Sequence, residues 1–231
     1  MSLSDRLAIV TGEGSGIGKA VCHALEREGA VVVVAALNLD AAKKTVAELK
    51  GKAHVALHVD VGDATSVASL INDVGCQFET PLIIVVNCAG VAKFSSVVDT
   101  PEEAYYHQLR VNLKGTFLVN QASVKAMLVS KVPEAAIVNI ASLSGKSGLA
   151  NAAAYAASKG GVIAFTKSLA QELGGTNIRV NALLPGTTQT PMLNFMPEDN
   201  LKALIGSVPM KRLARPEEVA DAAAFVLSWQ L

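Results

Sequence analysis

The segment GAVVVVAALNLD, residues 29–40, contains the pattern that decides the fold. Its four consecutive valines, at 31–34, predict a strand buried on both faces, as in the interior of a parallel sheet. In folds that bind dinucleotides, the second strand usually ends in an acid that holds the adenosine ribose of NAD. This strand runs instead into Ala35, Ala36 and Leu37. The segment therefore predicts the sheet but leaves open which dinucleotide, if any, the sheet binds.

Apolar strand-like runs alternate with helical patterns along the chain. We expect strands at 7–10, 31–35, 53–58, 82–87, 135–140 and 178–183, and helices at 17–28, 40–49, 65–74, 102–128 and 154–173. Such alternation is typical of right-handed βαβ units. The sequence predicts one α/β domain over residues 1–231, a Rossmann-type, doubly wound parallel sheet in a three-layer α/β/α arrangement. We expect residues 186–210, which look irregular, to form a substrate-covering flap.

The composition argues against several classes of protein. Of 231 residues, 51% are hydrophobic and only 4% aromatic, which suits aliphatic helices packed on a sheet. Twenty basic and twenty acidic residues cancel, so we expect no nucleic-acid partner. No apolar run approaches the ~18 residues that span a bilayer. The N-terminal residues lack a secretion signal, so we expect a protein that is neither membrane-spanning nor secreted.

Cysteines and histidines do not gather at metal-ligand spacings. The three cysteines are at 22, 76 and 88, and the four histidines are at 23, 54, 58 and 107. We expect reduced thiols and no metal site.

A glycine-rich loop, TGEGSGIG at residues 11–18, directly follows the first predicted strand. Gly12, Gly16 and Gly18 allow a tight turn and a close approach of the backbone to a pyrophosphate, which the next helix would meet with its free N–H groups. The spacing T-G-x-x-x-G-x-G differs from the usual G-x-G-x-x-G fingerprint. A glycine-rich turn without a ligand is the alternative reading of this loop.

Tyr155 and Lys159 are four residues apart and so share one face of a predicted helix. A nearby ammonium favours the phenolate, which makes the pair a plausible proton-transfer unit for an alcohol and its ketone. Alone, the pair fits any amphipathic helix equally well. Ser142, at the end of a predicted strand, is a candidate donor to a substrate carbonyl. Asn112 is an asparagine inside a predicted helix, where it is mildly unfavourable and needs a reason.

Taken together, these motifs resemble the short-chain dehydrogenase/reductase family. TGEGSGIG, HVDV, NCAG, RVNLKGTF, NIASLSG, YAASKGG, RVNALLPG and RPEEVADA occur in the family's order and spacing over residues 7–227. The resemblance is strongest to the branches that act on 17β-hydroxysteroids and on 3-oxoacyl thioesters. It implies hydride transfer between NAD(H) and a secondary alcohol or ketone on a small, apolar substrate.

The resemblance also implies residue roles. Tyr155 would be the acid/base, and Ser142 would hold the substrate carbonyl with it. Lys159 would hold the nicotinamide ribose and lower the tyrosine's pKa, and Asn112 would anchor a water on the proton path. The other implied cofactor contacts are Gly12, Ser15, Gly16, Ile17, Gly18, Leu37, Asp60, Val61, Asn87, Ala89, Gly90, Pro185, Gly186, Thr188 and Thr190.

Three positions bear on which dinucleotide is preferred. Ala36 offers the ribose no acid, but nothing nearby offers an arginine for a 2′-phosphate either. NADP-preferring relatives often carry Arg or Lys at the position of Ser15. Glu13 would repel a 2′-phosphate by roughly 2–4 kcal/mol. We therefore expect a weakened but NAD-preferring site, with NADP less favoured.

Assembly and location follow only by resemblance. The helices at 102–128 and 154–173 would form a homodimer, or a homotetramer with a second interface. The family's usual last strand is missing after FVLSWQL, so the strand at 178–183 would be an apolar edge that another chain could cover. One alternative is therefore a non-catalytic or cofactor-impaired partner subunit, in a hetero-oligomer with a related reductase. The implied location is the mitochondrial matrix, or otherwise the cytoplasm.

Overall fold

The valine run lies in strand β2 (Val31–Ala36) of a parallel sheet. The computed structural model describes residues 3–12, 16–51, 53–194, 196 and 198–228. Within these residues, six strands pair in the order β3-β2-β1-β4-β5-β6. The other strands are β1 (Leu7–Thr11), β3 (Val55–His58), β4 (Leu82–Asn87), β5 (Ala135–Ile140) and β6 (Ile178–Leu183). β2 lies between β1 and β3, and its valines 32–34 are 0% exposed, which confirms the strand with two buried faces.

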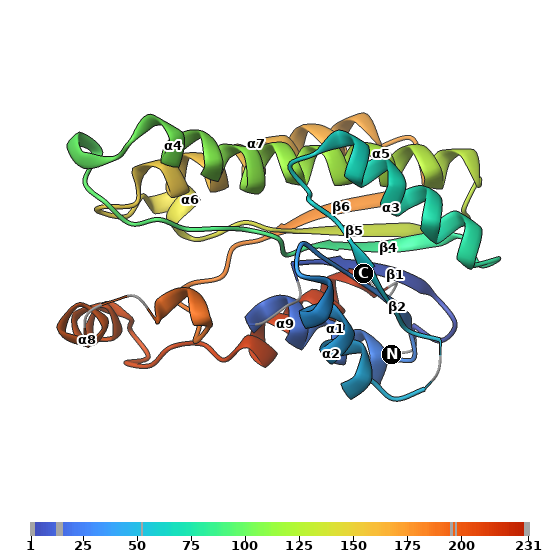
Figure 1. Cartoon of the computed structure of the whole chain (residues 1–231), viewed down its shortest axis with the longest axis horizontal. Coiled ribbons are helices and arrows are strands. Elements are labelled where there is room, and N and C mark those ends of the chain that lie inside the picture. Colours follow the sequence, from blue (N-terminus) through green and yellow to red (C-terminus); the bar gives the residue numbers. More distant parts are fainter. Residues whose placement is uncertain (1–2, 13–15, 52, 195, 197, 229–231) are drawn as a thin grey trace.

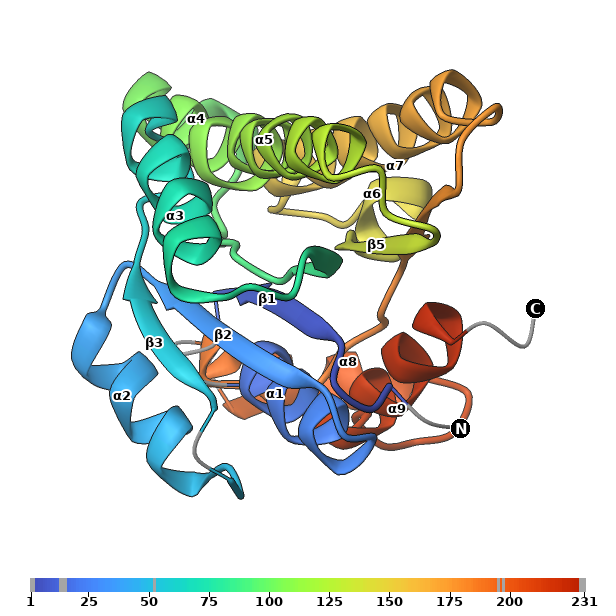
Figure 2. The same cartoon turned by 90° about the vertical axis from the view of Figure 1, so that its right-hand side faces the viewer.

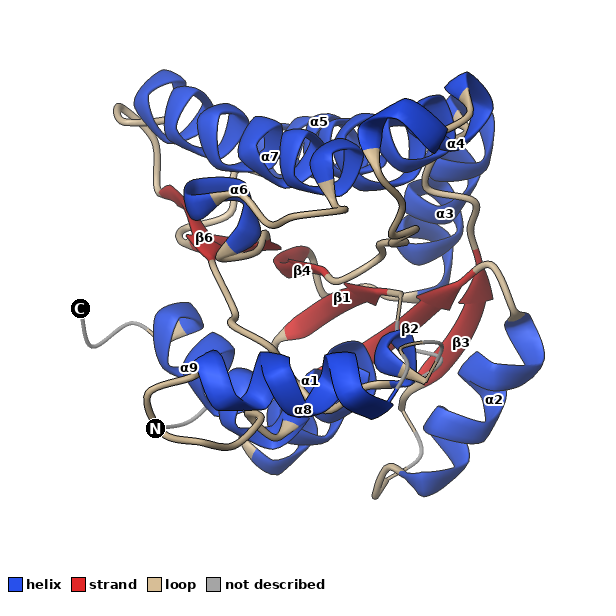
Figure 3. Ribbon diagram, turned by 90° about the vertical axis from the view of Figure 1, so that its left-hand side faces the viewer, coloured by secondary structure: helices blue, strands red, loops and turns tan. Residues whose placement is uncertain are grey.

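Helices cover both faces of the sheet, so the arrangement is the expected three-layer α/β/α fold (Figure 1). One layer contains α3 (Ala64–Gln77), α4 (Glu102–Gln108), α5 (Gly115–Val129) and α7 (Ala153–Glu172), with the short α6 (Ser144–Ser147) beneath them. The opposite layer contains α1 (Gly16–Arg27), α2 (Leu39–Glu48) and α9 (Pro216–Leu227). The same two layers are visible from either end of the molecule (Figures 2 and 3).

The strand order reverses direction at the middle of the sheet. The chain runs from β1 outward to β3 and then crosses to β4, which pairs with β1 on its other side. In open parallel sheets, ligands bind beyond the carboxyl ends of the strands at such a switch point. The topology therefore places a candidate site beyond Thr11 and Asn87, the last residues of β1 and β4.

A buried amide network holds the α5 and α7 layer against this part of the sheet. The Asn139 side-chain oxygen accepts hydrogen bonds from Asn87 at 2.8 Å and from Asn120 at 2.9 Å, and its amide donates to Thr166 at 3.0 Å. All four side chains are buried. These hydrogen bonds join β4, β5, α5 and α7, so the network helps to set how α5 and α7 lie over the sheet.

Two regions differ from the expected elements. The single helix expected at 102–128 is interrupted by a π-helical turn, Leu109–Lys114, between α4 and α5; we call it the π turn. The segment 186–210, expected to be irregular, contains a 3₁₀ turn (Pro191–Leu193) and helix α8 (Glu198–Ser207). A second 3₁₀ turn, Val97–Asp99, precedes α4. Among the described residues, no helix is long and apolar enough to cross a membrane.

Candidate active site

Four strands bring most of the predicted site residues to one edge of the sheet. Gly12 follows β1, Ala89 and Gly90 follow β4, and Ser142 follows β5. Pro185 follows β6, and its carbonyl accepts a hydrogen bond from the backbone of the β5 loop, Leu143 N, at 3.0 Å. Helix α7, in the layer that covers one face of the sheet, adds the side chains of Tyr155 and Lys159. The structure thus brings together residues that are up to about 170 positions apart in the sequence.

Ser142 and Tyr155 form the first pair of the site. The Ser142 Oγ accepts the backbone N–H of Ser144 at 3.1 Å, which leaves its hydroxyl hydrogen free to donate elsewhere. Burial raises the pKa of the Tyr155 phenol, and a hydrogen bond with Ser142 opposes that rise. The phenol therefore stays protonated at neutral pH and has a proton to give.

Lys159 lies one helical turn beyond Tyr155 and is only 4% exposed. Its Nζ donates to the Ile140 carbonyl at 2.7 Å and lies 5.9 Å from the centre of the Tyr155 ring. Burial lowers the pKa of Lys159 to about 8, so the group is still mostly protonated at neutral pH. The sequence suggested that this ammonium lowers the pKa of Tyr155. In the structure, burial raises the pKa of Tyr155, the hydrogen bond with Ser142 opposes that rise, and the net direction is upward.

Asn112 lies on the π turn and is fully buried. Its Oδ1 accepts from Val91 N at 2.8 Å, and its Nδ2 donates to Val91 O at 2.9 Å and to Ser158 Oγ at 2.9 Å. Ser158 in turn donates to the Tyr155 carbonyl at 2.7 Å. The unfavourable helix-interior asparagine thus has its reason, because its side chain joins the loop after β4 to helix α7.

The glycine loop makes close backbone approaches that only glycine allows. A Cβ on Gly12, whose φ is +74°, would lie 2.3 Å from the Cα of Ala89. A Cβ on Gly16, whose φ is +59°, would lie 2.9 Å from the Thr190 side chain. The loop therefore touches the segments after β4 and β6, and α1 begins at Gly16 with Ile17 and Gly18 in its first turn. Ser15 and Glu13, on which the NADP argument depends, lie outside the described residues.

The segment after β6 closes the site from the other side. Thr188 is buried, its hydroxyl donates to the Gly186 carbonyl at 3.0 Å, and its backbone forms a bridge with Ala214. Together with Pro185 and Thr190, it lies between the end of β6 and the glycine loop. The predicted nicotinamide-side residues are therefore neighbours in space.

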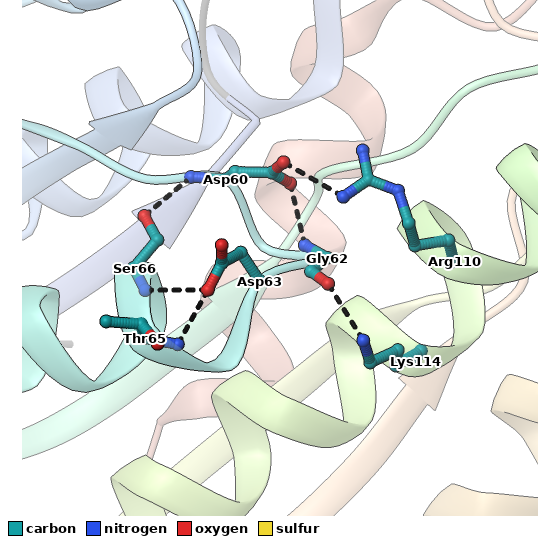
Figure 4. A network of polar contacts seen from close by, with 7 residues as sticks. All are labelled: Asp60, Gly62, Asp63, Thr65, Ser66, Arg110 and Lys114. Carbon is teal, nitrogen blue, oxygen red and sulfur yellow. Dashed lines mark hydrogen bonds and ion pairs between the residues drawn. The ribbon is translucent and has the colours of Figure 1, made fainter.

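The far end of the site is the loop after β3 (Figure 4). Asp60 accepts the N–H of Gly62 at 2.8 Å and the guanidinium of Arg110 at 2.9 Å. Burial tends to raise the pKa of Asp60, but the hydrogen bonds from Arg110 and Gly62 bring it below its usual value. Val61 is buried beside it. Leu37, after β2, is 68% exposed.

These features fit a dinucleotide. The loop before α1 admits no side chain at Gly12, and the first N–H groups of a helix suit a pyrophosphate. The Oδ1 of Asn87, at the end of β4, is buried with no hydrogen-bond partner among the described residues, so an acceptor is available there. Gly12, Gly16, Ile17 and Gly18 would hold the phosphates. The described residues contain no cluster that could hold a metal ion.

Three residues of the site were not found from the sequence. Phe94 lies beside Tyr155 with ring centroids 6.3 Å apart and is 39% exposed, so it borders the candidate site at Tyr155. Ser158 and Arg110 bond to Asn112 and Asp60, their partners 46 and 50 positions away. Only their positions next to Lys159 and within RVNLKGTF could have drawn attention to them.

Comparison with known proteins gives matches over nearly the whole chain. A family model described as Enoyl-(Acyl carrier protein) reductase matches residues 12–230. The chain is 42% identical to the (3R)-3-hydroxyacyl-CoA dehydrogenase of Canis lupus familiaris, over 99% of this chain and 91% of that protein.

Many solved structures are similar to this one, among them two reductases. The 3-ketoacyl-(acyl-carrier-protein) reductase of Brucella melitensis complexed with NADH gives a TM-score of 0.92 at 32% identity. An actinorhodin polyketide ketoreductase variant with NADPH gives 0.91 at 33%. Each comparison covers 99% of this chain and 93% of the other.

Proposed function

Because this chain belongs to the short-chain dehydrogenases/reductases, oxidoreductases that act on CH–OH groups with a nicotinamide cofactor, we propose that its substrate is a 3-hydroxyacyl or 3-oxoacyl thioester. The names of two similar proteins, a 3-hydroxyacyl-CoA dehydrogenase and a 3-ketoacyl carrier-protein reductase, support this class. Neither name mentions a 17β-hydroxysteroid, the other substrate class that the sequence suggested.

One observation carries the catalytic part of the proposal. Ser142, Asn112 and the α7 residues Tyr155 and Lys159 come from three separate segments, yet they lie together at the carboxyl edge of the sheet: Ser142 hydrogen-bonds Tyr155, Lys159 bonds to the end of β5, and Asn112 bonds to Ser158 on α7. A protein that served only as a partner subunit would have no need for this arrangement.

In the proposed mechanism, the residues handle the carbonyl oxygen and its proton. The cofactor, when bound, supplies or accepts the hydride. The Ser142 hydroxyl donates a hydrogen bond to the substrate oxygen and stabilises the negative charge that develops there. Tyr155 gives its proton to that oxygen on reduction and takes it back on oxidation. The nearby Lys159 ammonium stabilises the phenolate that Tyr155 leaves behind.

We propose NAD as the preferred dinucleotide. The side chain at the end of β2 is Ala36, only 4% exposed and uncharged, and Leu37 beside it is apolar, so neither selects for a 2′-phosphate. A missing acid costs NAD a charged hydrogen bond, about 1.5–3 kcal/mol. The proposed site therefore binds NAD(H) weakly for its class, with the negative charge of Glu13 disfavouring NADP.

The proposal includes a single domain, with residues 186–210 covering the substrate, and a homodimer through the layer of α4, α5 and α7. Apolar side chains exposed on α5, Phe117 at 42%, Leu128 at 49% and Val129 at 76%, support a covered face there. A homotetramer or a hetero-oligomer would use further surfaces. The proposed compartment is the mitochondrial matrix, which fractionation of the tagged protein tests.

A substrate panel tests the function. Purified protein is mixed with NADH or NADPH and with acetoacetyl-CoA, a longer 3-oxoacyl-CoA or a 17-ketosteroid, and cofactor oxidation is followed by absorbance. We expect turnover of the thioesters with NADH. Turnover of the steroid alone would replace the substrate class, and no binding of either cofactor would overturn the proposed function.

A further inference from the structure

The π turn that carries Asn112 has no cause in its own sequence. Residues 109–114, LRVNLK, contain neither glycine nor proline, yet they leave the α-helical hydrogen-bond pattern between α4 and α5. Wide turns of this kind are rare and occur often at functional sites. Contacts outside the segment must therefore hold it in this form.

Two basic side chains of the π turn donate hydrogen bonds to the loop after β3 (Figure 4). Arg110 Nη1 donates to Asp60 Oδ2 at 2.9 Å, and Lys114 Nζ donates to the Gly62 carbonyl at 3.1 Å. The packing between them is tight, because a Cβ on Gly62 would lie 2.7 Å from the Arg110 guanidinium. A Cβ on Gly115 would lie 2.7 Å from Val61. Loop and helix thus touch at two glycines and are joined by two polar contacts.

The loop is equally fixed on its other side, to helix α3. The Ser66 hydroxyl accepts the backbone N–H of Asp60 at 3.0 Å. The Asp63 side chain caps α3 by accepting the N–H groups of Thr65 at 2.7 Å and Ser66 at 3.2 Å. Asp60 is therefore held on two sides, by Ser66 of α3 and by Arg110 of the π turn.

In the sequence, Asn112 lies midway between Arg110 and Lys114, but it lies on a different face of the π turn. Positions two apart on a helix do not face the same way, and its side chain bonds to Val91 and Ser158 instead. The π turn therefore contacts the loop after β3 on one face and helix α7 on the other.

We propose that Arg110 and Lys114 couple the adenine end of the cofactor site to the catalytic centre, with Arg110 as a positioning residue. The inference rests on the proposed function and on the family resemblance, which implies that Asp60 and Val61 meet the adenine. Cofactor binding at that loop fixes Asp60, and Asp60 in turn fixes Arg110 and the π turn. The π turn then holds Asn112 against Ser158 on helix α7.

If Arg110 served only to stabilise the fold, its loss would lower the free energy of unfolding. The Arg110 side chain is 42% exposed and that of Asp60 is 27% exposed. Ion pairs this exposed contribute little to folding. Loss of Arg110 should therefore barely change the unfolding transition while it weakens the communication between the two ends of the site.

Hydrogen exchange with ADP-ribose, the half of the cofactor that carries no nicotinamide, tests the coupling without any reaction. In the wild type, ADP-ribose should slow amide exchange both at residues 60–62 and at residues 109–114. In Arg110→Met it should protect residues 60–62 alone, and the Kd for NADH should rise about 2- to 30-fold. Arg110→Lys, which keeps the charge, should restore part of both effects.

Arg27→Met is the matched control, because Arg27 makes a comparable exposed ion pair with Asp221 at 2.7 Å, between α1 and α9. It should change neither readout. Lys114→Met removes the hydrogen bond to the Gly62 carbonyl, so it should also reduce the protection of residues 109–114 by ADP-ribose. This second variant tests the inference even if Arg110→Met folds poorly. If ADP-ribose protects residues 109–114 in both variants as much as in the wild type, the inference is overturned but the proposed function stands. The same holds if the wild type binds ADP-ribose without protection of the π turn. A wild type that binds neither ADP-ribose nor NADH overturns the proposed function as well.

Discussion

Replacing Lys159 by methionine should stabilise the protein at neutral pH while it removes activity. The side chain is 4% exposed, and burial lowers its pKa from 10.5 to about 8. At 1.36 kcal/mol per pH unit, holding the ammonium in the folded state costs about 3 kcal/mol. Methionine is unbranched, fills the same space and carries no charge.

The gain is reduced by one lost hydrogen bond. Lys159 Nζ donates to the Ile140 carbonyl at 2.7 Å, and leaving that buried acceptor unpaired costs about 1–3 kcal/mol. The net change in the free energy of unfolding is therefore a gain of roughly 0–2 kcal/mol at pH 7, or up to several degrees in Tm.

The pH dependence separates the charge effect from packing. Below pH 8 the lysine is protonated in the folded and unfolded states, so the wild type carries the full penalty. Between pH 8 and 10.5 the folded protein releases its proton first, so the unfolded state holds more protons and wild-type stability rises with pH. All other groups titrate in both proteins, so the advantage of Lys159→Met should shrink across this window.

Urea unfolding of both proteins at pH 7 and pH 10 is the assay. Lys167→Met, at an exposed lysine on the same helix, is the control and should stay within about 0.5 kcal/mol of the wild type at pH 7. A Lys159→Met protein whose stability difference from the wild type is the same at pH 7 and pH 10 would refute the reasoning.

Three further predictions concern the cofactor and the assembly. Ala36→Asp should tighten NADH several-fold and leave NADPH no better by isothermal titration; a gain for NADPH would contradict the proposed preference. Gly12→Ala should destabilise the fold by about 2–4 kcal/mol in urea and abolish NADH binding, because its Cβ would meet Ala89 at a φ of +74°. Gly148→Ala, at a φ of +72° with nothing within 4 Å, is its control and should cost only about 1–2 kcal/mol, from the dihedral strain alone. Light scattering at micromolar concentration should show at least a dimer; monomer alone would argue against the proposed interface of α4, α5 and α7.

The strands could be predicted because their signal is local. Buried parallel strands are continuous apolar runs, and the runs at 31–35, 82–87, 135–140 and 178–183 correspond to strands of the structure within a residue. The helix at 102–128 was expected to be uniform, since its apolar pattern does not register the extra residue of a π turn. That turn hydrogen-bonds to Asp60 and Gly62, about 50 positions away, and such distant contacts have no local sequence signal.

The same distinction applies to the site. Tyr155 and Lys159 share a helix face, so their proximity could be inferred from spacing alone. The contacts of Ser158 with Asn112 and of Phe94 with Tyr155 join different elements, and no local pattern contains them. The direction of the Tyr155 pKa also depends on burial in the folded chain, which the four-residue spacing does not encode.

The most direct test of the account is Tyr155→Phe, which removes one oxygen and the transferable proton. NADH oxidation by acetoacetyl-CoA and the Kd for NADH are measured for this variant and the wild type. The account predicts that turnover falls by roughly 10²–10⁴-fold while the Kd stays within about twofold, because only proton transfer is lost. Turnover comparable to that of the wild type would contradict the assignment of Tyr155 as the acid/base, and with it the proposed chemistry of the site.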